Sequence, residues 1–131
     1  MPPIEQAIVY SVLEEKYCVV KLPPGSPAPA IPIHGELFSL TSTEEELSVV
    51  CQEISAPIGA QVERNWRAIK VQGPLEFELK GVLVSLLQPL ADAKVCAFAL
   101  STYNTDYILV KQYHLSAALQ ALELAGHRLT Q

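Results

Sequence analysis

The segment from Gly73 to Gly81 places two carboxylates, Glu76 and Glu78, beside the expected start of a helix at Leu79. The first N–H groups of a helix have no partner inside the helix and carry partial positive charge, so this end can bind an anion. A neighbouring carboxylate can accept an ammonium group. These groups together fit an amino acid, which carries one carboxylate and one ammonium. The alternative is that each glutamate is an ordinary solvated turn residue.

Three other residues belong to the same candidate site. Gly81 would cost about 1 kcal/mol in a helix interior, so we interpret it as marking a close approach by backbone or ligand, with a flexible helix start as the alternative. Ser101 and Thr102 open the polar run STYNTD. Their hydroxyl groups can either order a hairpin turn or contact a ligand.

Patterns that would indicate an enzyme or a metal site do not occur in the sequence. It contains no phosphate-binding Walker loop, no G-x-S-x-G motif and no G-x-G-x-x-G motif, and none of the three histidines has a partner at i, i+4. The cysteines lie in apolar, strand-like runs, which is typical of buried thiols: Cys18, Cys51 and Cys96. We therefore expect no catalytic residue, no metal and no cofactor.

The C-terminal part of the chain reads as strand, helix, strand, strand, helix and short last strand. Apolar residues from 79 to 90 and from 115 to 122 recur at helical spacing, and the runs at 95–101 and 106–112 are rich in β-branched and aromatic residues. This order is the βαββαβ unit, in which two helices cover one face of a sheet. Pro89 cannot donate to the Ser85 carbonyl, so we expect a kink or an early last turn there.

The N-terminal part predicts a smaller, mostly β half. The runs at 7–13 and 17–22 suggest a hairpin with a polar loop at 14–16, and residues 36–54 suggest two strands around a single helical turn capped by Ser42 and Glu45. Between them lies the Pro-rich loop 23–35, with five of the ten prolines. We interpret it as a stiff spacer, with a ligand for a polyproline-binding partner as the alternative. The pattern changes near residue 61, where we place the domain boundary.

Composition and charge restrict the class of partner. The chain has 131 residues, of which 50% are hydrophobic and 18% charged, as expected for a compact fold. Its formal net charge of −5 and the lack of any Lys or Arg cluster argue against nucleic acid and anionic membrane surfaces. No apolar run approaches the roughly 20 residues of a membrane span, and the first residues do not resemble a secretory signal. We expect a cytoplasmic protein.

The run LSTYNTDYILVK at 100–111 follows GPLEFELKGVLVSLLQPLADAKV and precedes a helix that ends in LAGH. Together these segments resemble the ACT domain, in the branch of small bacterial ACT proteins and of a eukaryotic cytosolic arginine sensor built from tandem ACT units. The segment TSTEEELSVVCQE resembles the N-terminal half of the same small proteins. The resemblance implies an α+β fold, with a ferredoxin-like βαββαβ ACT domain at 62–131 preceded by a smaller ACT-like half at 1–61.

The resemblance also implies regulation by a bound small molecule, usually an amino acid, at an interface between two ACT units. In the arginine sensor the ligand is held by backbone on the strand after the first helix, a position that corresponds here to Cys96 and Ala97. An acidic residue before the glycine that starts this helix also contributes, and corresponds to Glu78 before Gly81. An unpaired edge strand is stabilised when it pairs with a strand of a second copy of the chain, so we expect a homodimer.

The sequence therefore predicts a non-catalytic regulatory protein that binds an amino acid or a similar small metabolite and acts on its own association or on a regulated enzyme. Two alternatives stay open. The chain could be a structural protein–protein interaction module without a ligand. It could also be a detached regulatory subunit of an amino-acid biosynthetic enzyme such as aspartate kinase.

Overall fold

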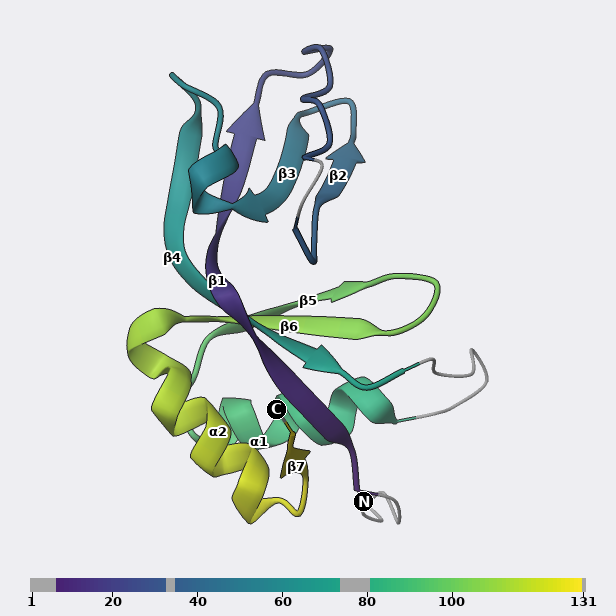
Figure 1. Ribbon diagram of the computed structural model, residues 1–131, viewed down its shortest axis with the longest axis vertical. Coiled ribbons are helices and arrows are strands. Elements are labelled where there is room, and N and C mark those ends of the chain that lie inside the picture. Colours follow the sequence, from purple (N-terminus) through teal and green to yellow (C-terminus); the bar gives the residue numbers. More distant parts are fainter. Residues whose placement is uncertain (1–6, 33–34, 74–80, 131) are drawn as a thin grey trace. The chain divides into compact units, whose positions relative to one another are not determined.

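The computed structural model describes residues 7–32, 35–73 and 81–130 (Figure 1). Within these residues the chain forms strands and two α-helices, with single turns of 3-10 helix at Glu53–Ser55 and Gln112–His114. The strands and helices, in chain order, are β1 (Val9–Leu22), β2 (Ser39–Ser42), β3 (Leu47–Gln52), β4 (Gln61–Val71), α1 (Val82–Asp92), β5 (Ala97–Ser101), β6 (Asp106–Lys111), α2 (Leu115–Leu124) and β7 (Arg128–Leu129). The fold is α+β, and β4 to β7 follow the predicted βαββαβ order.

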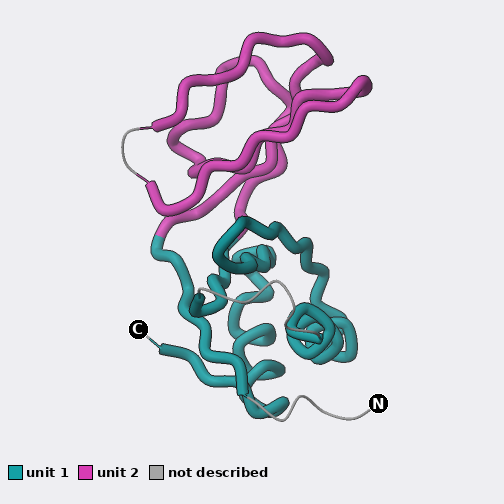
Figure 2. The backbone as a smooth tube through the Cα atoms, turned by 90° about the vertical axis from the view of Figure 1, so that its right-hand side faces the viewer, with its two compact units in different colours: residues 1–14, 67–131 teal, residues 15–66 magenta. Residues whose placement is uncertain are grey.

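The chain forms two compact units (Figure 2). Unit 2 is residues 15–66, and unit 1 combines residues 1–14 with residues 67–131. Strands β1 and β4 each cross a unit boundary and so contribute residues to both units. The sequence places the boundary elsewhere, between residues 1–61 and 62–131. That division into domains stays a prediction.

Strand β1 corrects the sequence prediction for the N-terminus. Residues 7–22 were expected to form a hairpin around the polar loop 14–16, but Val9–Leu22 is one continuous strand of 14 residues. The charged residues Glu14, Glu15 and Lys16 are exposed within it. They resemble a loop only by polarity, since they include no glycine, proline, asparagine or aspartate to bend the backbone.

In unit 1, two helices cover one face of a sheet whose described strands follow the order β7–β1–β4–β6–β5. The helix-facing core contains Leu86 and Leu90 of α1 and Leu122 of α2, all at most 1% exposed. This confirms, for residues 82–90, the apolar stripe predicted for the first helix, while Leu79 lies outside the described residues. The short strand β7 runs parallel to β1, and the Arg128 N–H donates to the Ile8 carbonyl at 2.9 Å. Unit 1 therefore brings the start and the end of the described chain together.

Pro89 lies in the last turn of α1, which ends at Asp92, as predicted. The proline leaves the Ser85 carbonyl without its usual helical donor. The buried side chain of His127 fills this role: its Nδ1 accepts from the Ile8 N–H at 3.1 Å, so the neutral ring carries its proton on Nε2, which lies 3.0 Å from the Ser85 oxygen. His127 thus connects α1, β1 and the segment before β7.

In unit 2, β2 and β3 form an antiparallel hairpin that continues to β1. The helical turn expected between them, capped by Ser42, is absent from the described residues 43–46. The Thr43 hydroxyl instead accepts from the N–H groups of Glu45 at 3.1 Å and Glu46 at 3.2 Å, closing a tight turn. A side-chain cap therefore exists, one residue later than predicted and in a hairpin.

The three cysteines differ in exposure. Cys18 and Cys51 face each other across β1 and β3, with their sulfur atoms 3.8 Å apart, and both are buried as predicted. Burial, with a contribution from the adjacent Cys51, raises the pKa of the Cys18 thiol to about 12. Burial also raises the pKa of Cys51. Cys96 is exposed, so the prediction of a buried thiol is wrong there. It precedes β5 and lies outside the strand whose apolar pattern suggested burial.

Candidate functional site

The predicted site residues fall into three groups in the structure. Glu76 and Glu78 lie outside the described residues. Gly81 directly precedes α1, with a left-handed φ of 79° that favours glycine over any residue with a side chain. Its carbonyl accepts from the Ser85 N–H at 2.9 Å, which starts the helical ladder. The backbone turn itself is therefore a sufficient reason for this glycine.

The other four residues lie in or next to β5, in one pair at each end of the strand. Cys96 and Ala97 are at the start of the strand, where Ala97 pairs with Val110, while Ser101 and Thr102 are at its end. Ala97 and Ser101 are four positions apart, which corresponds to about 13 Å along a strand. The structure therefore does not bring these two pairs into one cluster.

Ser101 and Thr102 take part in the hairpin turn between β5 and β6. The Ser101 hydroxyl donates to the Asp106 carboxylate at 2.5 Å. The Thr102 N–H donates to the Thr105 carbonyl at 2.8 Å. These bonds are those expected if the polar run orders the turn, one of the two interpretations given by the sequence. A contact with a ligand stays a prediction for both residues.

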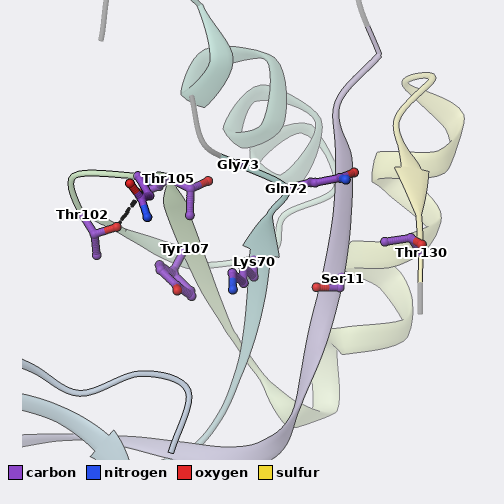
Figure 3. Close-up of a pocket in the computed structure, with 9 residues that line it drawn as sticks. Ser11, Lys70, Gln72, Gly73, Thr102, Thr105, Tyr107 and Thr130 are labelled. Atoms are coloured by element: carbon purple, nitrogen blue, oxygen red, sulfur yellow. Dashed lines mark hydrogen bonds between the residues drawn. The ribbon is translucent and has the colours of Figure 1, made fainter. Parts of the chain in front are cut away.

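Unit 1 contains a surface pocket of about 510 Å³ that the sequence did not predict as a whole (Figure 3). It is built from β1, the end of β4, the β5–β6 hairpin and the segment after β7. Its lining residues are Ser11, Lys70, Gln72, Gly73, Thr102, Asn104, Thr105, Tyr107 and Thr130. Only Thr102 is among the predicted site residues.

Strand alternation places Lys70 and Tyr107 in the pocket. Ile69, Val71 and Ile108 belong to the helix-facing core, so Lys70 and Tyr107, next to them in sequence, point to the opposite face of the sheet. The Lys70 ammonium nitrogen lies 6.0 Å from the centre of the Tyr107 ring, at the outer limit of a cation–π contact. The sheet thus presents an aromatic ring and a positive charge side by side.

Gly73 and Thr105 fix one end of the pocket. The Thr105 hydroxyl, which is buried, donates to the Val71 carbonyl at 2.7 Å and so ties the hairpin to β4. A Cβ added to Gly73 would lie 2.9 Å from the Asn104 carbonyl oxygen. Gly73 is therefore needed for the close approach of the hairpin to this segment.

The pocket carries one positive charge and no carboxylate among its nine described lining residues. Asp106 adjoins Tyr107 in the chain, but strand alternation directs it to the other face, where it bonds Ser101. The remaining polar groups are hydroxyls and amides, which both donate and accept hydrogen bonds. These groups offer hydrogen bonds to a polar ligand. The described lining offers no nucleophile with an adjacent base.

Two absences hold for the described part of the chain. No group of three or more His, Cys, Asp or Glu side chains there is arranged to hold a metal ion. None of the described helices has the length and apolar character needed to cross a bilayer.

Comparison with known proteins gives two family matches. A model described as an ACT domain matches residues 61–123. A second model, described as an N-terminal domain, matches residues 15–58. The two matches together cover most of the chain.

Individual relatives agree with these matches. A crystal structure of an Agrobacterium tumefaciens protein is 31% identical and covers 95% of this chain and 93% of that chain, with a TM-score of 0.87. The bovine cytosolic arginine sensor for mTORC1 subunit 1 is 32% identical over 66% of this chain, and the aligned part is 30% of the sensor's length. The ligand-free regulatory subunit of aspartate kinase from Thermus thermophilus, at 10% identity and a TM-score of 0.66, shares the fold; the match covers 93% of this chain and 100% of that chain.

Proposed function

Because the chain belongs to the ACT domain family, we propose that it is a regulatory protein that binds an amino acid and performs no covalent chemistry. The observation that carries this proposal is the 32% identity, over 66% of this chain, with a protein named as an arginine sensor. The sensor is about three times longer than the aligned part, so its partners do not transfer with the match. The fold likeness to aspartate kinase regulatory subunits is compatible with the same role.

We place the amino acid at the N-terminal tip of α1, at an interface between two ACT units. Gly81 turns the backbone there, and the first N–H groups of the helix offer partial positive charge to a carboxylate. Glu76 or Glu78 would accept the ammonium group. The backbone of Cys96 and Ala97 would come from a neighbouring ACT unit, because both residues follow the C-terminal end of α1, whereas Gly81 lies at its N-terminal end, about 15 Å away along the helix.

We further propose a homodimer in the cytoplasm. Strand β5 ends the sheet among the described strands, so its outer edge can pair with a second chain. Ligand binding at the interface would then change the dimer's stability or its affinity for a regulated enzyme, since a ligand shifts an equilibrium only by binding one state more tightly.

The test is a thermal-shift panel of the twenty amino acids, followed by calorimetry on any that stabilise the protein. A ligand at 100 times its Kd should add about 2.7 kcal/mol to the free energy of unfolding. Glu78→Ala should abolish the response and leave the fold intact, while Glu44→Ala, at an exposed turn in unit 2, should leave the affinity unchanged.

The outcomes separate the proposal from its competitors. An unchanged affinity in Glu78→Ala removes this residue from the site. A flat panel, with a protein partner still bound, favours a structural interaction module. Loss of an enzyme's feedback inhibition when the gene is deleted would favour a detached regulatory subunit.

A further inference from the structure

The buried thiols of Cys18 and Cys51 form a pair in unit 2 that the function proposed above does not use. We propose that this pair is a modification site, at which a peroxide converts the two thiols into a disulfide between β1 and β3. A dithiol reductant reverses the reaction by exchange. The site lies in unit 2 and does not depend on the amino-acid site proposed for unit 1.

The positions of the two residues on neighbouring strands suit a disulfide. Cys18 and Cys51 are directly opposite each other in the antiparallel pairing of β1 with β3. Opposite residues of such a pair have Cα atoms roughly 4.5–5.5 Å apart, inside the range of about 4.4–6.8 Å found for disulfides. The sulfur atoms are 3.8 Å apart and must approach to about 2.05 Å. Rotation about the side-chain bonds can provide this movement, so the two strands can stay paired.

The packing around the pair gives a small oxidant a way in. Both thiols are at most 1% exposed and belong to an apolar cluster of unit 2. The segment 53–60 contributes only Ala56 and Ala60 to the hydrophobic residues packed against this cluster, and none of its residues is buried. Ile54 and Ile58 are 89% and 103% exposed, so they add no packing. A segment with so few buried contacts opens at low cost in free energy. A molecule as small as hydrogen peroxide can therefore reach the thiols, whereas a larger reagent cannot.

The oxidation proceeds in two steps. Burial raises the pKa of both thiols, which keeps the closed pair protonated and slow to react. When the segment opens, one thiol ionises and its thiolate attacks the peroxide: an S–O bond forms, the O–O bond breaks, and the released hydroxide takes up a proton to give water. The second sulfur then attacks this sulfenic acid: the S–S bond forms, the S–O bond breaks, and a second water leaves with the second thiol proton. The pair loses two electrons and two protons, and the peroxide accepts them.

The disulfide would change the stability of unit 2. It joins residues that are 33 positions apart in the chain, and the loop that it closes contains the Pro-rich loop 23–35 and strand β2. A cross-link of this kind lowers the entropy of the unfolded chain. For a loop of this length we expect the equilibrium constant for unfolding of unit 2 to fall on the order of a hundredfold. Peroxide would therefore make unit 2 more resistant to unfolding.

The first experiment treats the reduced full-length protein with hydrogen peroxide, removes the peroxide, blocks the remaining thiols with iodoacetamide in urea and digests the protein with trypsin. Trypsin cleaves after Lys and Arg, so the three cysteines fall in separate peptides, at residues 17–21, 22–64 and 95–111. Mass spectrometry should detect a cross-linked product of peptides 17–21 and 22–64, formed at a rate independent of protein concentration and removed by dithiothreitol. Peptide 95–111 contains the exposed Cys96 and serves as the internal control that peroxide has reacted.

The second experiment measures stability by urea unfolding, followed through the fluorescence of Trp66, the single tryptophan, which lies in unit 2. The oxidised protein should unfold at a higher urea concentration than the reduced protein. Cys96→Ser should keep both the cross-link and this shift. Cys18→Val, which keeps a small apolar side chain in the core, should lose both. Circular dichroism checks that each variant folds, and the peptide map of the natural protein decides the proposal even if Cys18→Val does not.

The proposal is overturned if peroxide oxidises Cys96 but yields no link between peptides 17–21 and 22–64, or if this link forms only in urea. It is also overturned if the linked protein unfolds at the same urea concentration as the reduced protein, or if either peptide carries sulfinic acid and no link. The amino-acid panel is run on reduced protein, so its result is separable from the peptide map.

Discussion

Substitution of His127 tests how the structure accommodates Pro89. In His127→Leu, the Ile8 N–H and the Ser85 carbonyl both lose their side-chain partner. A buried polar group left unsatisfied costs about 1–3 kcal/mol. Ile8 is buried, whereas Ser85 is half-buried and so belongs at the low end of that range. The free energy of unfolding should therefore fall by about 2–4 kcal/mol.

A double-mutant cycle isolates the link to the proline. Pro89→Ala restores an N–H that can bond the Ser85 carbonyl within the helix, so the loss of His127 should then leave only Ile8 without a partner. His127→Leu should cost about 1 kcal/mol less in the Pro89→Ala background than in the natural protein. His127→Gln, whose amide nitrogen can reach as far as Nε2, should lose less stability than His127→Leu.

The measurement is urea unfolding followed by circular dichroism, with free energies from linear extrapolation. The reasoning is refuted if the cost of His127→Leu is the same in both backgrounds to within about 0.5 kcal/mol, the usual limit of additivity. In that case the Ser85 carbonyl is not what His127 stabilises. An equal loss of unfolding free energy in His127→Leu and His127→Gln would also show that the Ser85 carbonyl is not what His127 stabilises.

Further predictions concern close packing and the thiols. Gly73→Ala should lower the free energy of unfolding by about 1–3 kcal/mol, because the new Cβ would lie 2.9 Å from the Asn104 oxygen; an unchanged urea midpoint would contradict this. Ellman's reagent should modify Cys96 quickly in the native protein, and Cys18 and Cys51 only after denaturation; three fast thiols would show that the pair is accessible. The pKa of Cys18 is raised from 9.0 to about 12, so the folded state keeps a proton that the unfolded state loses in this range. Stability should be full below about pH 9 and fall as the pH rises toward 12, and Cys18→Val should flatten this fall in urea titrations at stepped pH.

Local periodicity was enough to predict the helices and the order of elements in the C-terminal part. The spacing of Leu86 and Leu90 identified the buried face of α1, and Pro89 marked its last turn, as the structure confirms. Such features depend on residues within a few positions of each other, whose patterns are directly visible in a sequence.

Contacts between distant segments could not be predicted in this way. The charges at 14–16 suggested a turn, yet β1 continues through them because pairing with other strands holds it extended. Ser11 and Thr130 line one pocket because β7 pairs with β1, a result of tertiary topology that no local pattern records. The polar run STYNTD, which includes Thr102, was a local signal for this pocket, and it fits an ordered hairpin turn equally well.

Unit 1 is interrupted by unit 2, and the ends of that interruption lie next to each other. The Gln72 N–H donates to the Val9 carbonyl at 2.8 Å, and the Arg67 guanidinium donates to the Leu13 carbonyl at 2.9 Å, so β1 and β4 run in opposite directions with residues 14 and 67 adjacent. In protein-engineering terms, residues 15–66 are an insert at the tip of a hairpin. A two-residue Asn-Gly turn has the right geometry to replace them. The shortened chain would keep the strands of unit 1 and both helices, whereas truncation at residue 61 would discard one of those strands, the N-terminal part of β1.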